Sequence, residues 1–234
     1  MPLIDNTNAD TRLSGLERFL ERWYGTRKPE FGHPPTVLDQ LQIPGVLRRF
    51  YAFAGRWPPN DERYSDNRFC RQDRFLPLAR QAWGSVYRDG SYFVFMAENQ
   101  GVWEAATLTH GDDAGVWVSV DGSHRTDRPT WRQLKCTLSE FLVTFVLQEC
   151  VMGSLGAAGE GILERFESAG CTIELVCLDG EYAWKGDRRS YYLIDSSVLL
   201  YRVTGDAELY DDWYGYETKA GEDLLRRLNL PVQT

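Results

Sequence analysis

The sequence predicts a single α+β domain over residues 1–234, built around a mostly antiparallel or mixed twisted sheet. Three observations lead to this class. Apolar residues recur with a helical period near the N-terminus, alternation and turn signals typical of strands follow Gly55, and one broad apolar helical segment lies near residues 138–153. We therefore expect N-terminal helices, a set of core strands, and a later helix that packs on the sheet.

Two amphipathic helices are expected at the start of the chain. The apolar positions of the first are Leu13, Leu16, Leu20 and Trp23. Ser14 followed by Glu17 fits a capping box, and Gly25 would end this helix. The second helix falls within residues 43–55, where Pro44 suits a first helical turn and Gly55 supplies the stop.

Strand signals follow the second helix. Residues 74–79 and 85–97 are rich in β-prone side chains, and Asp89-Gly90 within the second stretch is a strong hairpin signal. Residues 103–108 are expected to form another strand. In residues 115–122 three valines alternate with Trp117 and Ser119, which is the two-residue period of a strand.

A polar break, Glu98-Asn99-Gln100-Gly101, interrupts the apolar run of residues 93–97. A catalytic interpretation would use Glu98 as an acid or base and the two amides as oxyanion donors. The structural alternative is a strand that ends in a tight turn, where Asn99 and Gly101 accept unusual backbone angles. The sequence ties no second carboxylate or histidine to Glu98, so the turn is favoured.

The helical period returns once in the middle of the chain. Thr137 and Glu140 fit a second capping box, and Gly153 would end the helix. Its apolar stripe is Leu138, Phe141, Leu142, Phe145 and Val146. The glycine-rich residues 153–161 favour a flexible linker over a phosphate-binding loop, because they lack the lysine and Ser/Thr of a P-loop.

Residues 172–230 are expected to add strands and a short helix. Strands are indicated at 172–178, 181–184, 191–194 and 198–203, with a turn at Asp179-Gly180 and a terminal helix within 220–231. Because these strands are few, pairing with the same sheet as the core strands, within a single domain, is favoured. The alternative is that residues 1–40 and 155–234 build an additional structure.

Composition narrows the class of function. Twenty-six Lys and Arg against 34 Asp and Glu give a net charge of -8, which argues against binding nucleic acid or an anionic membrane and suits a basic partner. The apolar stretches are far shorter than the roughly 20 residues needed to span a bilayer. The first residues show no basic start followed by an apolar run, so we expect no secretory signal and a cytoplasmic location.

No recognisable cofactor, metal or catalytic set emerges from the sequence. The cysteines, Cys70, Cys136, Cys150, Cys171 and Cys177, are odd in number and form no CxxC pair, so buried reduced thiols are expected. His33, His110 and His124 lie far apart in polar segments, which argues against a zinc site or a Cys-His dyad. The arginine-rich residues 56–74 also carry acids, which favours a solvated loop over a nucleic-acid site.

Five segments, taken in order, resemble the SUKH superfamily, which includes immunity proteins of bacterial polymorphic toxin systems and fungal regulators of cell-wall synthesis. They are IPGVLRRFYAFAG at 43–55, RFLPLA at 74–79, YFVFMAENQGVWEAA at 92–106, AGVWVSVDG at 114–122 and LSEFLVTFVLQE at 138–149. The core of the resemblance therefore covers 43–149, nearly half the chain, and its most specific element is the ENQG-V break.

The resemblance implies an α+β binding fold without a shared catalytic constellation, used mainly to bind and neutralise a protein toxin such as a nuclease or deaminase. The expected protein is thus not an enzyme but an immunity protein that occludes its toxin stoichiometrically. An acidic inhibitor would suit a toxin with a basic surface. The alternative is an intracellular regulatory or scaffold protein that uses the same fold, and a hydrolase is a third class.

One C-terminal stretch is the candidate protein-binding patch, because aromatic anchors there alternate with acids. Its candidate residues are Asp206, Glu208, Tyr210, Asp211, Asp212, Trp213, Tyr214 and Tyr216. The same pattern also fits an ordinary edge strand whose aromatic side chains turn inward. A sugar subsite with two carboxylates is a further alternative.

Overall fold

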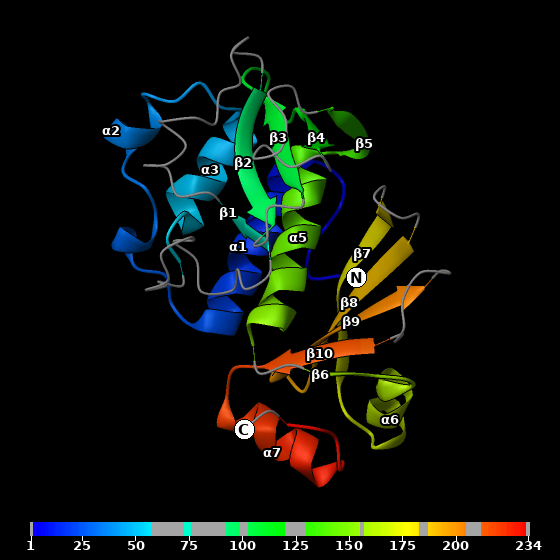
Figure 1. Ribbon diagram of the computed structural model, residues 1–234. Helices are drawn as coiled ribbons and strands as arrows, with labels where there is room; N and C mark the ends of the chain where they lie inside the picture. Colours follow the sequence, from blue (N-terminus) through cyan, green and yellow to red (C-terminus); the bar gives the residue numbers. More distant parts are fainter. Residues whose placement is uncertain are drawn as a thin grey trace. The chain divides into compact units, whose positions relative to one another are not determined.

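The computed structural model describes residues 2–57, 73–75, 92–98, 103–119, 130–154, 157–182, 187–204 and 212–232 (Figure 1). The chain divides into two compact units. Unit 1 comprises Met1–Gly25 and Val143–Thr234, and unit 2 comprises Thr26–Leu142. Each contains helices and one antiparallel sheet, so the predicted α+β class is confirmed.

Along the described chain, the N-terminal helices precede five strands, and α5, β6 and α6 then lead to four further strands and a last helix. The helices are α1 (Ala9–Tyr24), the 3-10 turn η1 (Pro29–Phe31), α2 (Pro35–Leu38), α3 (Gly45–Ala54), α5 (Leu138–Gly153), α6 (Ile162–Ser168) and α7 (Lys219–Arg227). The strands are β1 (Asp73–Phe75), β2 (Tyr92–Glu98), β3 (Glu104–Leu108), β4 (Gly115–Ser119), β5 (Arg132–Thr137), β6 (Ala157–Gly159), β7 (Ile173–Tyr182), β8 (Asp187–Ile194), β9 (Val198–Thr204) and β10 (Asp212–Tyr216).

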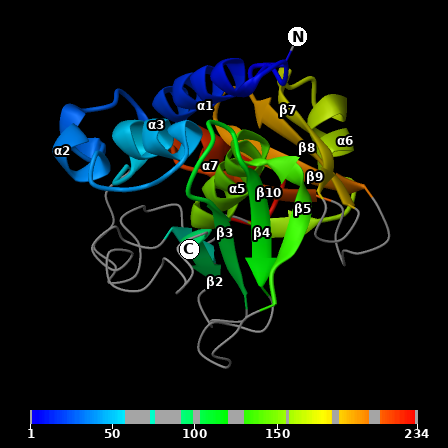
Figure 2. The same ribbon diagram turned by 90° about the horizontal axis from the view of Figure 1, so that it is seen from above.

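Unit 2 is built on a five-stranded sheet in the order β1-β2-β3-β4-β5, so each strand pairs with its neighbour in sequence. Figure 2 shows β2 to β5 lying side by side. The first turn of α5 is anchored to the β3–β4 connection, because Ser139 N donates to Asp113 Oδ1 at 2.8 Å. Phe141 then meets Phe95 of β2 edge to face, with centroids 5.7 Å apart. The expected helix on the sheet is therefore present.

Unit 1 holds a second five-stranded antiparallel sheet in the order β6-β10-β9-β8-β7. One face packs on α5, where the Tyr191 hydroxyl donates to the Thr144 carbonyl at 3.0 Å. On the same side Arg22 of α1 forms an ion pair with Glu174 of β7 at 2.7 Å. The opposite face forms a core with α6, α7 and Leu230, so helices cover both faces of this sheet.

The expectation that the later strands would join the core sheet is wrong. The strands after residue 155 pair only with one another among the described residues. The glycine-rich stretch that favoured a linker contributes β6, whose Ala157–Gly159 pairs with Asp212–Tyr214 of β10. The helix α6 follows it and was not expected. The described strands of the second sheet therefore pair among themselves, and helices cover both faces of that sheet.

Two expected boundaries also differ from the structure. The capping box at Ser14 and Glu17 is wrong, because α1 starts earlier: Asn8 accepts from Thr11 N at 3.0 Å and Thr11 Oγ1 accepts from Asn8 N. The turn at Asp179-Gly180 is also wrong. The strand β7 runs through both residues to Tyr182, and a register shift between Leu178 and Glu181 accommodates them within the ladder.

Other expectations are confirmed. The second capping box forms as predicted, since Thr137 N donates to Glu140 Oε2 at 2.9 Å and Glu140 N donates to Thr137 Oγ1. The helix α3 begins at Gly45 after Pro44 and ends at Ala54, with Gly55 as its C-cap. The polar break also begins as expected, with β2 ending at Glu98. The remainder of that break, Asn99 to Gly101, and the Asp89-Gly90 hairpin lie outside the described residues.

Candidate protein-binding surface

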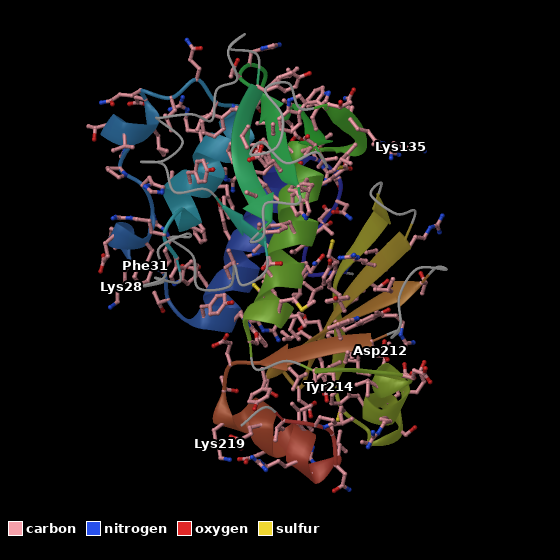
Figure 3. The ribbon with its side chains drawn as sticks, in the orientation of Figure 1. Lys28, Phe31, Lys135, Asp212, Tyr214 and Lys219 are labelled. Carbon is pink, nitrogen blue, oxygen red and sulfur yellow. The ribbon has the colours of Figure 1, made fainter. Side chains whose placement is uncertain are left out.

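The candidate patch divides between described and undescribed parts of the chain. Asp206, Glu208, Tyr210 and Asp211 lie outside the described residues. Asp212, Trp213, Tyr214 and Tyr216 belong to β10, which lies between β6 and β9, and Figure 3 labels Asp212 and Tyr214 on that strand. Within the described strands β10 is therefore an inner strand and not an edge.

Asp212 is a structural residue of the second sheet. Its side chain is fully buried, at 0% exposure, and its carboxylate accepts two hydrogen bonds from Arg202 on β9, at 2.7 and 2.8 Å. Its Oδ2 also accepts from Leu163 N at 3.0 Å, in the first turn of α6. The first N–H groups of a helix have no partner inside the helix, so Asp212 serves as the cap that Gly161 cannot supply with a side chain.

Arg202 connects this buried acid to the surface. Its Nη1 and Nη2 donate to the two carboxylate oxygens of Glu164 at 2.7 and 2.6 Å, a fork-to-fork geometry. Hydrogen bonding from Arg202 lowers the pKa of Glu164, whose side chain is 56% exposed. The three residues tie β9, β10 and α6 together, and Glu164 is the member that faces solvent.

Tyr214 and Tyr216 belong to the core between the sheet and the helices α6 and α7. The Tyr214 hydroxyl donates to the Pro231 carbonyl at 3.0 Å, and burial raises the pKa of Tyr214 to about 12. Burial likewise raises the pKa of Tyr216. The side chains of Asp212, Tyr214 and Tyr216 thus make internal contacts, as the inward-turned alternative to the binding patch anticipates.

Trp213 lies on the opposite face of β10. Its ring stacks on Tyr201 with centroids 6.1 Å apart and planes 10° apart, and Tyr201 in turn contacts Tyr191 at 5.9 Å. The Arg189 guanidinium lies 5.6 Å from the centre of the Tyr201 ring, and the Arg189 Nη1 donates to Gln148 of α5. Trp213 is half-buried and is the one described member of the patch with an accessible side chain.

The two-residue period explains this division. Asp212, Tyr214 and Tyr216 alternate with Trp213 and Gly215, so a strand places the first three on one face. That alternation is visible in the sequence and already favours a core-facing row. A protein-binding role for Trp213 and for the undescribed members of the patch stays a prediction.

A second group of aromatic side chains belongs to the sheet of unit 2 and was not anticipated. Tyr92 of β2 stacks on Trp131 with centroids 5.6 Å apart, and it meets Trp117 of β4 edge to face at 5.6 Å. All three are half-buried. They come from segments far apart in sequence, and no local pattern links them, so only the pairing of the strands reveals the cluster.

The acidic charge of the chain is concentrated in unit 1. Its residues include 20 Asp and Glu against 11 Lys and Arg, for a formal charge of -9. Unit 2 has 14 acids against 15 bases, for a formal charge of +1. Any electrostatic attraction of a basic partner therefore arises from unit 1.

Within the described ranges, no group of three or more His, Cys, Asp or Glu side chains is placed to hold a metal ion. In the same part of the chain, no helix combines the length and apolar character required to cross a membrane.

Three comparisons with known proteins identify no relative of this chain. No family model matches the chain, and neither the curated proteins nor the solved structures contain a match.

Proposed function

We propose that this chain is an immunity protein that acts in the cytoplasm, binds a protein toxin of the nuclease or deaminase type, and neutralises it by covering its active site. The interaction is stoichiometric, and the inhibitor itself performs no chemistry. Its partner has a basic surface, because a toxin that acts on nucleic acid must attract phosphate groups.

The observation that carries the proposal is the ordered resemblance of residues 43–149 to the SUKH superfamily. Four of the five matching segments contribute described elements of unit 2, namely α3, β1, β2 with β3, and β4. The fifth is α5, whose first turn packs on that sheet. Four segments and the start of the fifth, up to Leu142, thus belong to one compact unit, which supports their use as a single resemblance.

The charge distribution gives independent support. A formal charge of -9 on unit 1 would steer a basic toxin toward the inhibitor and raise the association rate at low ionic strength. The Arg202 charge is offset by Asp212 and Glu164 within the sheet, so the steering charge comes from other exposed acids, such as Glu160 and Glu167.

Co-expression tests the proposal. The chain is produced in a bacterial host together with each toxin domain encoded beside its gene, and growth is compared with that of cells that receive the toxin alone. We expect rescue by one toxin domain and a 1:1 complex by light scattering. An unrelated acidic protein of similar charge is the control for non-specific neutralisation.

Failure of every neighbouring toxin domain to be rescued or bound would contradict the proposal. Rescue by the unrelated acidic protein to the same degree would also contradict it, because the effect would then be one of charge alone.

A further inference from the structure

Two arginines hold the turn η1 against the end of α3 in unit 2. Arg27 Nε donates to the Phe53 carbonyl at 2.7 Å, and its Nη2 donates to the Ala52 carbonyl at 2.8 Å. Arg56 Nη2 donates to the Glu30 carbonyl at 2.8 Å. The last carbonyls of a helix have no partner inside it, so Arg27 satisfies two of them at the end of α3. Both guanidinium groups are thus held in place, and each keeps N–H groups that donate to no described residue.

Aromatic rings lie directly beside these cations. Phe31 of η1 stacks on the buried Trp57 with centroids 5.9 Å apart, and Phe53 meets Trp57 edge to face at 5.7 Å. The Arg27 guanidinium lies 5.1 Å from the centre of the Phe53 ring, and Lys28 Nζ lies 5.9 Å from that of Phe31. Figure 3 labels Lys28 and Phe31 next to each other. Both phenylalanines are half-buried, so part of each ring reaches solvent.

The charge around the turn is positive and unpaired. Residues 26–33 and 51–57 hold three Lys and Arg and one acid, Glu30, which gives a formal charge of +2. Within the described part of the chain, none of these four side chains forms an ion pair. Lys28, Glu30 and Arg56 are exposed to solvent. An acidic partner would therefore not have to displace an internal carboxylate from any of the three cations.

The neighbouring histidine responds to the same positive charge. His33 N donates to the Tyr51 carbonyl at 2.9 Å, and its ring meets the Tyr51 ring edge to face. Burial first, and then the Arg56 charge, lower the pKa of His33 to about 4, against a hydrogen bond with the Gly55 backbone. A carboxylate close to the ring would raise that pKa, and none among the described residues does so. The charge of Arg56 is therefore not cancelled where it reaches the histidine.

A surface of this kind fits an acidic segment of another protein. Arginine and aromatic side chains are enriched at protein interfaces, and complementary charge speeds association and improves discrimination. A guanidinium that is already held in place loses little further freedom when a partner binds.

The residues that we name the η1 surface are Arg27, Lys28, Phe31, Phe53 and Arg56. We infer that the η1 surface binds an acidic segment of a protein partner, whose carboxylates meet the cations and whose apolar side chain packs on Phe31. This partner is opposite in charge to the one that unit 1 would attract, so the inference goes beyond the proposed function and does not depend on it.

Titration with two matched peptides tests the assignment. In the first peptide, glutamates flank a central leucine, and in the second every glutamate is replaced by glutamine. Amide chemical shifts of the isotope-labelled full chain are followed by NMR near neutral pH, at low and at high salt. We expect the glutamate peptide to shift the amides of 27–33 and 53–57 saturably, and to bind less tightly at high salt because the charges are screened. The glutamine peptide should leave these amides unchanged.

Two charge reversals of equal size locate the site. Lys28→Glu changes the η1 surface, and Lys135→Glu makes the same change at another exposed lysine of unit 2, on β5. Figure 3 shows the two lysines at well-separated places. The Lys28 side chain donates to no described residue, so the turn stays anchored by Arg27 and Arg56. We expect Lys28→Glu to raise the Kd of the glutamate peptide about tenfold and Lys135→Glu to raise it less than about twofold.

Inorganic phosphate is the competing occupant, because it can use the guanidinium groups but not the rings. If phosphate shifts the amides of 27–33 as strongly as the glutamate peptide at equal concentration, the surface holds a simple anion and the inference is overturned. Equal weakening by the two charge reversals, or peptide shifts confined to other residues, would overturn it as well. None of these results involves a toxin domain, so the proposed function is judged separately by rescue of growth.

Discussion

Arg202 and Asp212 lie opposite each other on neighbouring strands and are joined by two parallel hydrogen bonds of 2.7 and 2.8 Å. The acid is fully buried, whereas the Arg202 side chain is 21% exposed. One charged pair therefore fixes the junction of β9, β10 and the first turn of α6, and one end of it reaches the surface through Glu164.

Removing Arg202 should damage unit 1 far more than removing its exposed partner. Arg202→Met leaves the buried Asp212 carboxylate without its cation, and we expect a loss of about 3 kcal/mol in the free energy of unfolding. Glu164→Gln removes only the exposed pair and should lose less than about 1 kcal/mol. Urea unfolding of the two variants measures both, and losses of equal size would contradict the structural role of the buried pair.

His33 should make stability depend on pH. Burial, aided by the nearby Arg56 charge and opposed by a hydrogen bond with the Gly55 backbone, lowers the pKa of His33 to about 4 from its ordinary value of 6.5. Below pH 6.5 the unfolded chain therefore binds a proton at His33 that the folded chain does not bind. The free energy of unfolding accordingly decreases as the pH falls from 6.5 to 4. Because the ring is partly solvated, the expected loss is about 1–2 kcal/mol.

The control for this effect is His110→Gln, a change at an exposed histidine. Urea midpoints measured from pH 7.5 to 4 should fall less steeply for His33→Gln than for His110→Gln and the wild type. Identical slopes for all three proteins would exclude His33 as the source.

The end of α7 offers a stabilising substitution. Asn229 has φ of 52°, and the bonds from Leu230 N to the Leu225 carbonyl and from Asn229 N to the Arg226 carbonyl form a Schellman motif. Asn229→Gly should raise the free energy of unfolding by about 0.5 kcal/mol, and Asn229→Val should lower it by about 1 kcal/mol. Chemical denaturation gives both values, and a Val variant as stable as the Gly variant would refute this account.

Adding even one methyl group at Gly32 should destabilise the fold. A Cβ there would lie 1.8 Å from the carbonyl oxygen of Ala52 in α3, where the loop docks through the bond from His33 N to the Tyr51 carbonyl. Gly32→Ala should lower stability by about 3 kcal/mol because backbone must move. A Cβ at Gly25 would have no atom within 4 Å, so Gly25→Ala strains only a backbone with φ of 90°. This substitution should lower the free energy of unfolding by about 1 kcal/mol. Thermal and urea unfolding compare them.

The cysteines should differ in reactivity. Burial raises the pKa of the Cys150 thiol far above its usual value, with the Glu217 and Glu149 carboxylates acting in the same direction. Cys136 is half-buried. Alkylation of the folded protein at pH 8, followed by mass mapping, should label Cys136 well ahead of Cys150. Equal rates in the folded protein, with equal rates after unfolding, would show that Cys150 is not shielded.

The parts of the fold that sequence predicts are those with strong local signals. The Thr137–Glu140 capping box and the Gly55 stop are contained in a few adjacent residues, and both form as expected. The strand β5 and the helix α6 were missed, because Arg132–Thr137 is mostly polar and Ile162–Ser168 spans only seven residues. Such elements are stabilised by their neighbours rather than by their own pattern.

The candidate site shows the same limit. The acids and aromatic residues of 205–217 are evident in the sequence. The contact between Asp212 and Arg202 is not, because the pairing of β9 with β10 brings the two residues together and buries Asp212.

The division of the chain into two units determines the order in which they can fold during synthesis. Unit 2 is continuous, whereas unit 1 needs both the N-terminal segment and residues after Val143. The apolar face of α1, which includes Leu16 and Phe19, therefore leaves the ribosome long before β7 exists to receive the Arg22 contact. At about 5–20 residues per second that interval lasts roughly eight to thirty seconds. Until then α1 of a nascent chain lacks its contact with β7, although its own apolar face is already complete.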